Sequence, residues 1–459
     1  MERSNNGGSE LPTSADVVGP DPELLTGPLQ ASLRERLHHA IPGGTHTYAK
    51  GDDQYPAEAP AVIVRGEGCR VWDVDGNEFI EYGAGLRAVT LGHAFPTVVQ
   101  AVTAALGAGT NFVRPSLVEL ECAEQLIGLV SAADMVKFTK DGSTATTAAV
   151  KLARAHTGRD LIALCADHPF FSYDDWFFAT TSVDAGIPRG VAELSLTFRY
   201  NDIGSLERLF DQHPEQIAAV ILEPERGDPP RADFLKWVED LCRREGAVLI
   251  LDEMITGFRW DIGGAQAVYG VTPHLSTFGK GLANGFSVSA LVGQREIMEL
   301  GGLRHDRERV FLLSTTHGAE THSLAAAIAT MTTYQEEDVI GALHEAGRRL
   351  RAGVEAAADG AGVGDFFRVL GRDCNLVYET RDPEGAPSQA YRTLFLQELV
   401  RRGVLAPSFV VNYAHDEATI DATVEIVAHA LAVYRRALDD GVDRYLSGPS
   451  VKPVYRRFN

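Results

Sequence analysis

The stretch AVLILDEMITGFRWDIGGAQAVYGVTPHLSTFGKGLANG, residues 247–285, contains the two elements that decide the fold. Its apolar run 247–251 ends abruptly in two acids, the first of which is Asp252. A strand buried on both faces of a parallel sheet has this pattern when it delivers a carboxylate to its C-terminal end. A second short stretch, 275–278, leads into Lys280, which lies between two glycines. Because ligands bind at the carboxyl ends of the strands in open α/β sheets, we expect Asp252 and Lys280 to share one crevice.

An amine and a carboxylate in one crevice suit a particular chemistry. A lysine amine holds an aldehyde cofactor covalently, and a carboxylate keeps the pyridine nitrogen of that cofactor protonated, so that the ring withdraws electrons. The same residues are equally consistent with a buried strand that ends in a solvated acid and a surface lysine in a glycine-rich loop. The rest of the chain has to decide between these two interpretations.

Composition excludes several classes of function. The chain has 459 residues and a formal net charge of −21, which argues against a nucleic-acid partner, because phosphate backbones are bound by basic faces. Its five cysteines are scattered and form no CxxC pair, as is typical of reduced thiols in a cytosolic protein. The polar N-terminus and the lack of a long apolar run predict a cytoplasmic protein without a membrane partner.

The order of strand and helix patterns predicts the domain organisation. We expect a flexible tail at 1–22, and then an N-terminal segment, 23–95, that contributes to a small domain and to the active-site entrance. A helix is predicted at 24–40, and a hairpin is predicted around Asp75-Gly76.

The remaining chain predicts an α/β fold with two further parts. In residues 96–337, helical patterns alternate with apolar strands, which predicts a large domain with a mostly parallel, helix-covered sheet. The predicted strands are 136–139, 161–165, 218–222, 247–251, 275–278 and 288–293. Residues 338–459 read as long helices around one or two strands, which predicts a smaller C-terminal α+β domain.

Two further motifs carry possible chemistry. The stretch KFTKDGSTATTAAVKLARAHTGR, residues 137–159, turns at 141–144 and then continues as an alanine-rich helix. Such a helix start is either an anion site or a plain N-cap by Ser143 or Thr144. The stretch HPFFSYDDWFF, residues 168–178, holds six aromatic residues that are either core or stacking partners for a planar cofactor. The histidines near Thr316 have no metal-ligand spacing, so no metal is expected.

Taken together and in this order, the motifs resemble the class III aminotransferases of PLP fold type I, and within them the glutamate-1-semialdehyde aminomutase branch. The resemblance covers about residues 38–440. It is carried by the following motifs: PGG at 42–44, VWDVDGNEFIEY at 71–82, LGHAFP at 91–96, DGSTA at 141–145, YND at 200–202, EP at 223–224, LDEMITGFR at 251–259 and FGKG at 278–281.

The resemblance implies pyridoxal 5′-phosphate (PLP) as cofactor and assigns roles to individual residues. Lys280 matches the lysine that binds PLP covalently, and Asp252 matches the acid paired with the pyridine nitrogen. The phosphate-binding turn matches Gly142, Ser143 and Thr144. Glu223 matches an acid on the floor of the site, and Phe170 lies where the family has an aromatic ring stacked on the cofactor. Thr316, with Thr315 as the alternative alignment, matches a threonine that reaches the phosphate of a neighbouring subunit, which implies a homodimer.

Some positions depart from the family pattern. The family's aromatic-His-Gly run is Phe170-Phe171-Ser172 here, and its Ser-Gly-Thr turn is Asp141-Gly142-Ser143. A carboxylate at Asp141 is unfavourable beside a phosphate unless it points away. On the substrate side, Lys50 stands at the position of the aminomutase's arginine. Gly85-Leu86, followed by Arg87, replaces its Ser-Trp pair. These changes leave the substrate open.

We therefore expect a PLP-dependent aminotransferase that moves an amino group from an amino donor to a keto or aldehyde acceptor by a ping-pong mechanism. Lys50 and Arg87 are the candidates for binding the carboxylate of an acidic substrate. A side chain that only donates hydrogen bonds to backbone carbonyl groups is as consistent with the sequence. The alternatives are an aminomutase that returns the amine to the same carbon skeleton, a PLP-dependent decarboxylase, and a PLP-fold protein without turnover.

Overall fold

Seven strands form the central sheet of the computed structural model, which describes residue 20 and residues 25–168, 170–225 and 227–458. Their order is β4-β10-β9-β8-β7-β5-β6, and β10 alone runs antiparallel to its neighbours. The bounds are Met135–Thr139 (β4), Leu161–Cys165 (β5), Ser195–Phe198 (β6), Ile217–Leu222 (β7), Val248–Asp252 (β8), Leu275–Phe278 (β9) and Ser289–Gly293 (β10). The predicted α/β class is therefore confirmed. Strand β6 was not foreseen, because its SLTF sequence is short and lacks a clear apolar run.

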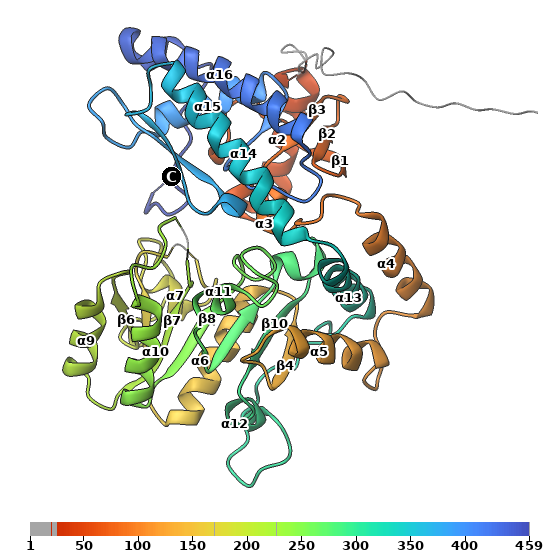
Figure 1. Cartoon of the computed structure of the whole chain (residues 1–459), viewed down its shortest axis with the longest axis vertical. Helices are drawn as coiled ribbons and strands as arrows, with labels where there is room; N and C mark the ends of the chain where they lie inside the picture. The colour runs from red at the N-terminus through yellow and green to blue at the C-terminus, as the bar shows by residue number, and fades with distance from the viewer. Residues whose placement is uncertain (1–19, 21–24, 169, 226, 459) are drawn as a thin grey trace, which may run out of the picture.

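Helices cover both faces of this sheet because its strands are apolar on both sides. On β7, Ile221 packs in the cluster that contains helix α6, Gly142–Thr157, whereas its neighbours Val220 and Leu222 pack in the cluster of the opposite face. That opposite face is covered by α9, Ile203–Gln212, and α10, Phe234–Glu245 (Figure 1). This two-sided burial explains why the strands read as continuous apolar runs instead of alternating patterns.

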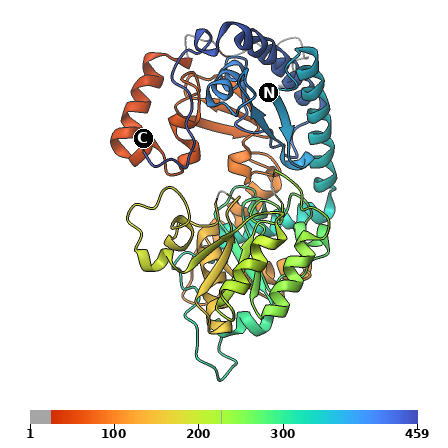
Figure 2. The same ribbon diagram turned by 90° about the vertical axis from the view of Figure 1, so that its left-hand side faces the viewer.

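A second lobe combines the beginning of the described chain with its end (Figures 1 and 2). Its four-stranded sheet has the order β1-β2-β3-β13, and a separate hairpin is formed by β11 and β12. The bounds are Ile63–Glu67 (β1), Arg70–Asp73 (β2), Glu78–Glu81 (β3), Phe367–Leu370 (β11), Val377–Thr380 (β12) and Val404–Leu405 (β13). The long helices are α2, Pro28–Ala40; α14, Val339–Gly360; α15, Gln389–Val400; and α16, Glu417–Asp440.

The pairing of β3 with β13 ties residues early in the chain to the C-terminal part. The two strands run parallel, with Ile80 opposite Val404. This supports the expectation that residues 23–95 contribute to the small domain, while the domain boundaries themselves remain predictions. The hairpin turn at Asp75-Gly76 lies between β2 and β3, as the sequence indicated. The predicted helix at 24–40 begins later, at Pro28, because proline favours the first turn of a helix. The predicted tail at 1–22 falls almost wholly outside the described residues.

Shorter elements complete the fold. Helices α4, Pro96–Ala108; α5, Leu117–Leu129; and α13, Thr321–Glu336 pack against one another beside the sheet. The remaining short helices are α3, Ala84–Arg87; α7, Asp175–Phe178; α8, Arg189–Ala192; α11, Ala265–Tyr269; and α12, Arg295–Met298. The 3₁₀ turns are η1, Pro42–Gly44; η2, Tyr48–Lys50; η3, Asp52–Gln54; η4, Lys280–Ala283; η5, Glu299–Gly301; η6, Asp373–Asn375; and η7, Val442–Arg444. Within the described part of the chain, no helix has the length and apolarity that a membrane crossing requires.

The contact between α14 and the β11–β12 connection leaves no room for a side chain at Gly347. A Cβ atom added there would lie 1.8 Å from the backbone oxygen of Asp373, whereas one added at Gly360 at the end of the same helix would meet nothing within 4 Å. We predict that Gly347→Ala lowers the free energy of unfolding by about 1–3 kcal/mol despite the better helix propensity of alanine. Gly360→Ala is the control and should leave it unchanged or slightly raised. Urea unfolding followed by circular dichroism measures both, and equal stability of the two variants would contradict the packing argument.

Candidate active site

Three backbone segments converge on the side chain of Met254. Asp252 ends β8 and is 3% exposed, and its Oδ1 accepts hydrogen bonds from the Met254 N–H at 3.0 Å and the Thr277 hydroxyl at 3.1 Å. A Cβ added to Gly142 would lie 2.9 Å from Met254 Sδ, and one added to Gly279 would lie 2.7 Å from the same atom. The start of α6, the residue before Lys280 and the Asp252 turn thus approach one sulfur, which only glycine permits.

Lys280 follows β9 in a strained backbone conformation. Its φ is +46°, in the left-handed region that costs a non-glycine residue roughly 1–2 kcal/mol. It begins the 3₁₀ turn η4, and its side chain is half-buried. Because β8 and β9 are parallel neighbours, with Asp252 opposite Thr277, the lysine and the acid reach the same edge of the sheet. Strain of this kind is characteristic of functional positions.

Burial dominates the electrostatics of the two acids that end β8. It raises the pKa of Asp252 from 3.8 to about 6, and the Lys280 charge, the Met254 N–H and the Thr277 hydroxyl oppose this rise. Burial also raises the pKa of Glu253 to about 7. The Glu253 carboxylate points elsewhere, since it accepts N–H groups of Ala265 and Gln266 at the start of α11, both at 2.8 Å. Asp252, on whose pKa the charge of Lys280 acts, is therefore the acid on the side of the lysine.

The start of α6 is capped by Asp141, which corrects the expectation that Ser143 or Thr144 would be the N-cap. Asp141 Oδ1 accepts the Thr144 N–H at 2.8 Å, and both carboxylate oxygens contact the Thr144 hydroxyl. The sequence pattern suggested the wrong residue because all three types are good caps and only the backbone path decides among them. The buried Ser143 hydroxyl instead accepts the N–H of Tyr173 at 3.1 Å, which ties the turn to the aromatic segment.

The aromatic segment 168–178 is mostly core. Phe171 and Phe177 are 2% exposed, whereas Phe170 is 44% exposed and meets the edges of Phe177 and Phe178. The proposed stacking of Phe170 on a cofactor stays a prediction. No role was predicted for His168, whose Nδ1 accepts the N–H of Glu223 at 3.1 Å and so joins this segment to the end of β7.

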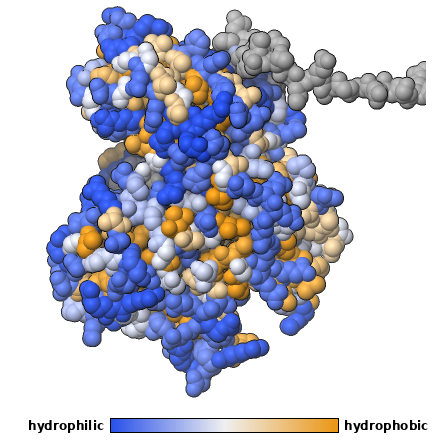
Figure 3. Space-filling view, viewed as in Figure 1, coloured by the Kyte–Doolittle hydropathy of each residue, from blue (hydrophilic) through white to orange (hydrophobic). Residues whose placement is uncertain are grey.

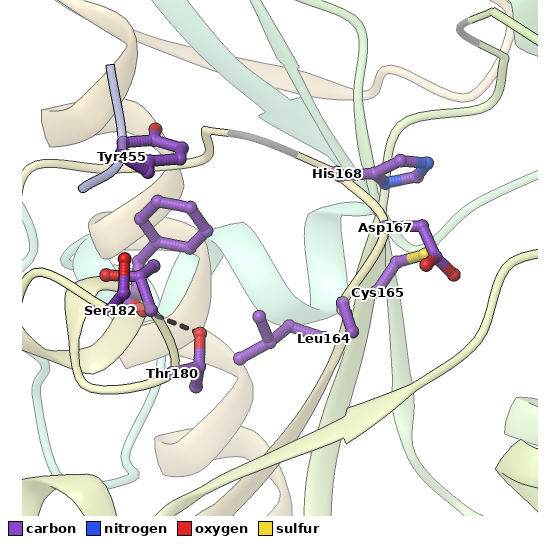
Figure 4. A pocket seen from close by; sticks show the side chains of 10 residues that line it. Leu164, Cys165, Asp167, His168, Thr180, Ser182 and Tyr455 are labelled. Carbon is purple, nitrogen blue, oxygen red and sulfur yellow. Dashed lines mark hydrogen bonds between the residues drawn. The ribbon is translucent and has the colours of Figure 1, made fainter. Parts of the chain in front are cut away.

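A pocket is lined by the end of β5 and the residues that follow it, including Asp167 and His168. Figure 4 shows His168 and Asp167 pointing away from Tyr455, Thr180 and Ser182, which line the pocket together with Phe177. Its volume is about 210 Å³. The ring of Tyr455 packs edge-on against Phe178, with centroids 6.0 Å apart, so the C-terminal tail forms one wall. Asp252 and Lys280 are not among the residues that line this pocket.

Arg87 ends an unusual turn. Four consecutive residues, Ala84 to Arg87, have φ between +46° and +71°, so α3 is a left-handed turn and not a regular α-helix. Arg87 Nε donates to Asn375 Oδ1 at 2.9 Å, and its carbonyl oxygen lies 3.5 Å from Arg259 Nη2. Arg259 is 1% exposed and also donates to the carbonyl groups of Cys374 and Val411, both at 2.9 Å.

An ion pair that the sequence did not indicate links the two lobes. Arg372, in the connection after β11, binds Glu225, just after β7, with Nη2 and Oε2 2.9 Å apart. Tyr269 contacts both side chains. Glu225 is 3% exposed. Burial lowers the pKa of Arg372, but the hydrogen bond and charge of Glu225 outweigh it and raise that pKa. A pair this far apart in sequence carries no local signal.

Three other predicted site residues are exposed to solvent. Lys50 ends the turn η2 in the small lobe and is exposed. Its neighbourhood is held by the C-terminal tail, through the Asp53 carbonyl and the Lys452 N–H at 2.8 Å. Thr315 and Thr316 are exposed, and the Thr316 carbonyl accepts a hydrogen bond from Asn111 Nδ2 at 2.9 Å. The nearby Glu320 pairs with Lys140 and His317, so the acid and histidines of this stretch form ion pairs. Among the residues that the structure describes, no group of three possible metal ligands occurs.

Comparison with known proteins identifies the family. The model of the family described as aminotransferase class-III matches residues 51–431. The chain is a class III aminotransferase. The glutamate-1-semialdehyde 2,1-aminomutase of Thermomicrobium roseum is 33% identical to it over 427 residues, which cover 88% of this chain and 98% of the relative.

Solved structures agree with this assignment. An omega-transaminase from Sphaerobacter thermophilus has a TM-score of 0.82 and 29% identity, and the match covers 91% of this chain and 100% of that one. The FumI protein of Sphingopyxis sp. MTA144, solved with PLP, has a TM-score of 0.80 and 28% identity, with 90% and 98% covered. The aminotransferase therefore has PLP fold type I and depends on PLP, as expected.

The crevice at Met254 fits this cofactor. PLP needs an amine for its aldehyde, an acid for its ring nitrogen and an anion site for its phosphate. Lys280, the buried Asp252 and the start of α6 supply these three kinds of group, and the glycines at 142 and 279 let their backbones approach Met254 closely.

The raised pKa of Asp252 makes the stability of the cofactor-free aminotransferase depend on pH. Because the native pKa lies near 6 and the ordinary value is 3.8, the native state binds a proton that the unfolded state releases. This contribution is fully present below about pH 4 and is lost as the pH rises through 6. Between pH 5 and 7.5 we predict a loss of about 1.4 kcal/mol for the wild type that Asp252→Asn does not show. Urea unfolding of both cofactor-free proteins at the two pH values measures this difference, and parallel pH profiles would refute it.

Proposed function

We propose that this aminotransferase moves an amino group from an amino donor to a keto or aldehyde acceptor in two successive half-reactions at the Lys280–Asp252 crevice. The convergence of Gly142, Gly279 and the Asp252 turn on Met254 carries the proposal, because it joins three independent parts of the chain at one point. The omega-transaminase from Sphaerobacter thermophilus supports the same chemistry by structural similarity.

The proposed roles follow from position. Lys280 Nζ holds PLP covalently, and Asp252 accepts the N–H of its ring nitrogen. Gly142 and Ser143, at the start of α6, bind the phosphate, with Thr144 as a third candidate. Glu223 forms the floor of the site at the end of β7. We propose that the ring of Phe170 stacks on the cofactor. This would require the exposed Phe170 side chain to turn towards Asp252. When bound, PLP supplies an electron sink that lets an amino group leave one carbon skeleton and join another.

Lys280 and Asp252 have different roles in the proposed proton transfers. Once released from the cofactor by a donor amine, Lys280 would act through Nζ as the base that takes the proton from the donor carbon and as the acid that returns it. This transfer requires a neutral amine. Asp252, with a pKa of about 6, is ionised at neutral pH and so stabilises a protonated ring nitrogen. The first product leaves, and the same residues act in reverse on the acceptor.

An acidic substrate is the proposed class, with Arg87 and Lys50 as the groups that bind its carboxylate. The Arg87 guanidinium donates to Asn375 and its backbone carbonyl accepts from Arg259, in a strained turn, and this supports a positioned side chain. The aminomutase of Thermomicrobium roseum favours the second candidate function, an internal transfer of the amine. The two are distinguished by whether turnover needs a separate amino donor.

A homodimer is proposed as the active form. Exposed apolar side chains cluster on α5 and the loop before it, including Val113, which is 100% exposed, and Phe112 at 51%. Apolar patches are visible on the lobe that carries α5 (Figures 1 and 3). Patches of this kind mark interfaces. The loop reaches the predicted dimer threonine through the bond from Asn111 to Thr316. We also propose a cytoplasmic location, which the five free, buried cysteines support.

The covalent role of Lys280 is tested by Lys280→Ala. Because no other amine is placed by the β9–η4 turn, we predict loss of turnover by at least about a thousandfold and no covalent attachment of PLP. Borohydride reduction followed by peptide mass spectrometry should label Lys280 in the wild type and no residue in the variant. Lys236→Ala, at an exposed lysine on α10, is the control. Full activity of Lys280→Ala would end this proposal.

The dimer proposal predicts that Val113→Asp weakens self-association. A charge in an apolar interface costs several kcal/mol, so sedimentation velocity should show a dimeric wild type and a largely monomeric variant. Val64→Asp, at an exposed valine on β1 in the other lobe, should remain dimeric. A monomeric wild type, or two equally dimeric variants, would count against the interface.

A further inference from the structure

The carboxylate of Asp141 lies at the N-terminus of α6, where the proposed phosphate site also lies. Asp141 places Oδ1 2.8 Å from the Thr144 nitrogen and 3.1 Å from its hydroxyl, and Oδ2 lies 2.9 Å from that hydroxyl. Its charge therefore sits among the free N–H groups at the positive end of the helix dipole. A helix start serves an anion best when its own cap is neutral, and this one carries a full negative charge.

The same cap withdraws donors from the site. The Thr144 N–H and hydroxyl are engaged by Asp141, and the Ser143 hydroxyl already accepts the N–H of Tyr173. The backbone N–H groups of Gly142 and Ser143 remain at the first turn, where helical N–H groups have no partner within the helix. The turn therefore offers fewer donors to a phosphate than its sequence suggests.

The lysine beside the turn does not offset the charge of Asp141. Lys140 Nζ lies 2.8 Å from Glu320 Oε2 and donates to Ser323 at 3.1 Å. This pairing lowers the pKa of Glu320, so its carboxylate stays ionised and satisfies the lysine. The neighbourhood of the turn thus keeps the negative charge of Asp141, which acts over several ångströms in this partly buried setting.

We propose that Asp141 lowers the affinity of this aminotransferase for PLP by repelling its phosphate. The cofactor therefore binds less tightly than it would beside a neutral cap. The inference rests on the proposed function of the α6 turn as the phosphate site. Asp141 has two opposing effects: its acceptor atom orders the turn, and its charge repels the phosphate. Asparagine separates these effects, because it caps a helix as well as aspartate does but carries no charge.

The test is titration of the full-length, cofactor-free protein with two probes, PLP and pyridoxal, which lacks the phosphate. Absorbance and quenching of intrinsic fluorescence report the dissociation constants. Asp141→Asn should bind PLP about tenfold more tightly than the wild type, a change of ~1.4 kcal/mol, and should bind pyridoxal within twofold of the wild type. The gain should shrink at high salt, because salt screens charges near the surface.

A matched control comes from the small lobe. Asp416 caps α16 with the same bond, from the Thr419 N–H to its Oδ1 at 2.8 Å. Asp416→Asn should therefore leave the affinity for PLP unchanged. Asp141→Ser, a neutral cap of smaller size, should tighten PLP binding in the same direction as Asp141→Asn.

The outcomes separate the inference from the proposed function. A wild type that binds neither PLP nor pyridoxal would refute the proposed function. A wild type that binds PLP while Asp141→Asn binds it equally or more weakly would overturn the inference alone. An equal gain for PLP and pyridoxal would also overturn it, since the effect would then not act through the phosphate.

Discussion

The parallel pairing of β8 with β9 is the constraint on which the site depends. Its hydrogen bonds set Asp252 opposite Thr277, so that an acid and the lysine that follows β9 emerge at the same edge of the sheet. Neighbouring parallel strands are held about 4.8 Å apart, which keeps the two functional groups within reach of one small molecule. The contacts of Gly142 and Gly279 with Met254 then bring the start of α6 to the same point. A shift of β8 by one residue would turn Asp252 to the other face of the sheet.

This arrangement buries several charged side chains, and each of them has a different set of partners. Asp252 keeps an N–H and a hydroxyl as donors and has Lys280 nearby. Arg259 is buried among backbone carbonyl groups of the small lobe and has a pKa that burial lowers. Glu225 is matched by Arg372 from across the lobes. Because a buried charge that loses its partner costs several kcal/mol, these contacts also fix how the lobes meet around the crevice.

Much of the fold was readable from the sequence because the sheet is buried on both faces. The run at 161–165 coincides with β5, and the turn at Asp75-Gly76 lies where glycine and aspartate favour it. Strand β6 was not foreseen, since its short SLTF sequence lacks the pattern of a buried strand. The N-cap of α6 was assigned to the wrong residue, because Asp141, Ser143 and Thr144 are all capable caps and their spacing alone does not rank them.

The sequence by itself determined the family, the alternation of strands and helices, and the residue types that the chemistry needs, because these are properties of local patterns and of motif order. Only the tertiary structure decided which of the two adjacent acids lies on the side of Lys280. It also decided that Asp141 caps the N-terminus of α6 and that Arg87 lies in a left-handed turn between Asn375 and Arg259. These outcomes depend on contacts between residues that are far apart in the chain, and on the direction of individual side chains. Neither leaves a signal in the spacing of residue types.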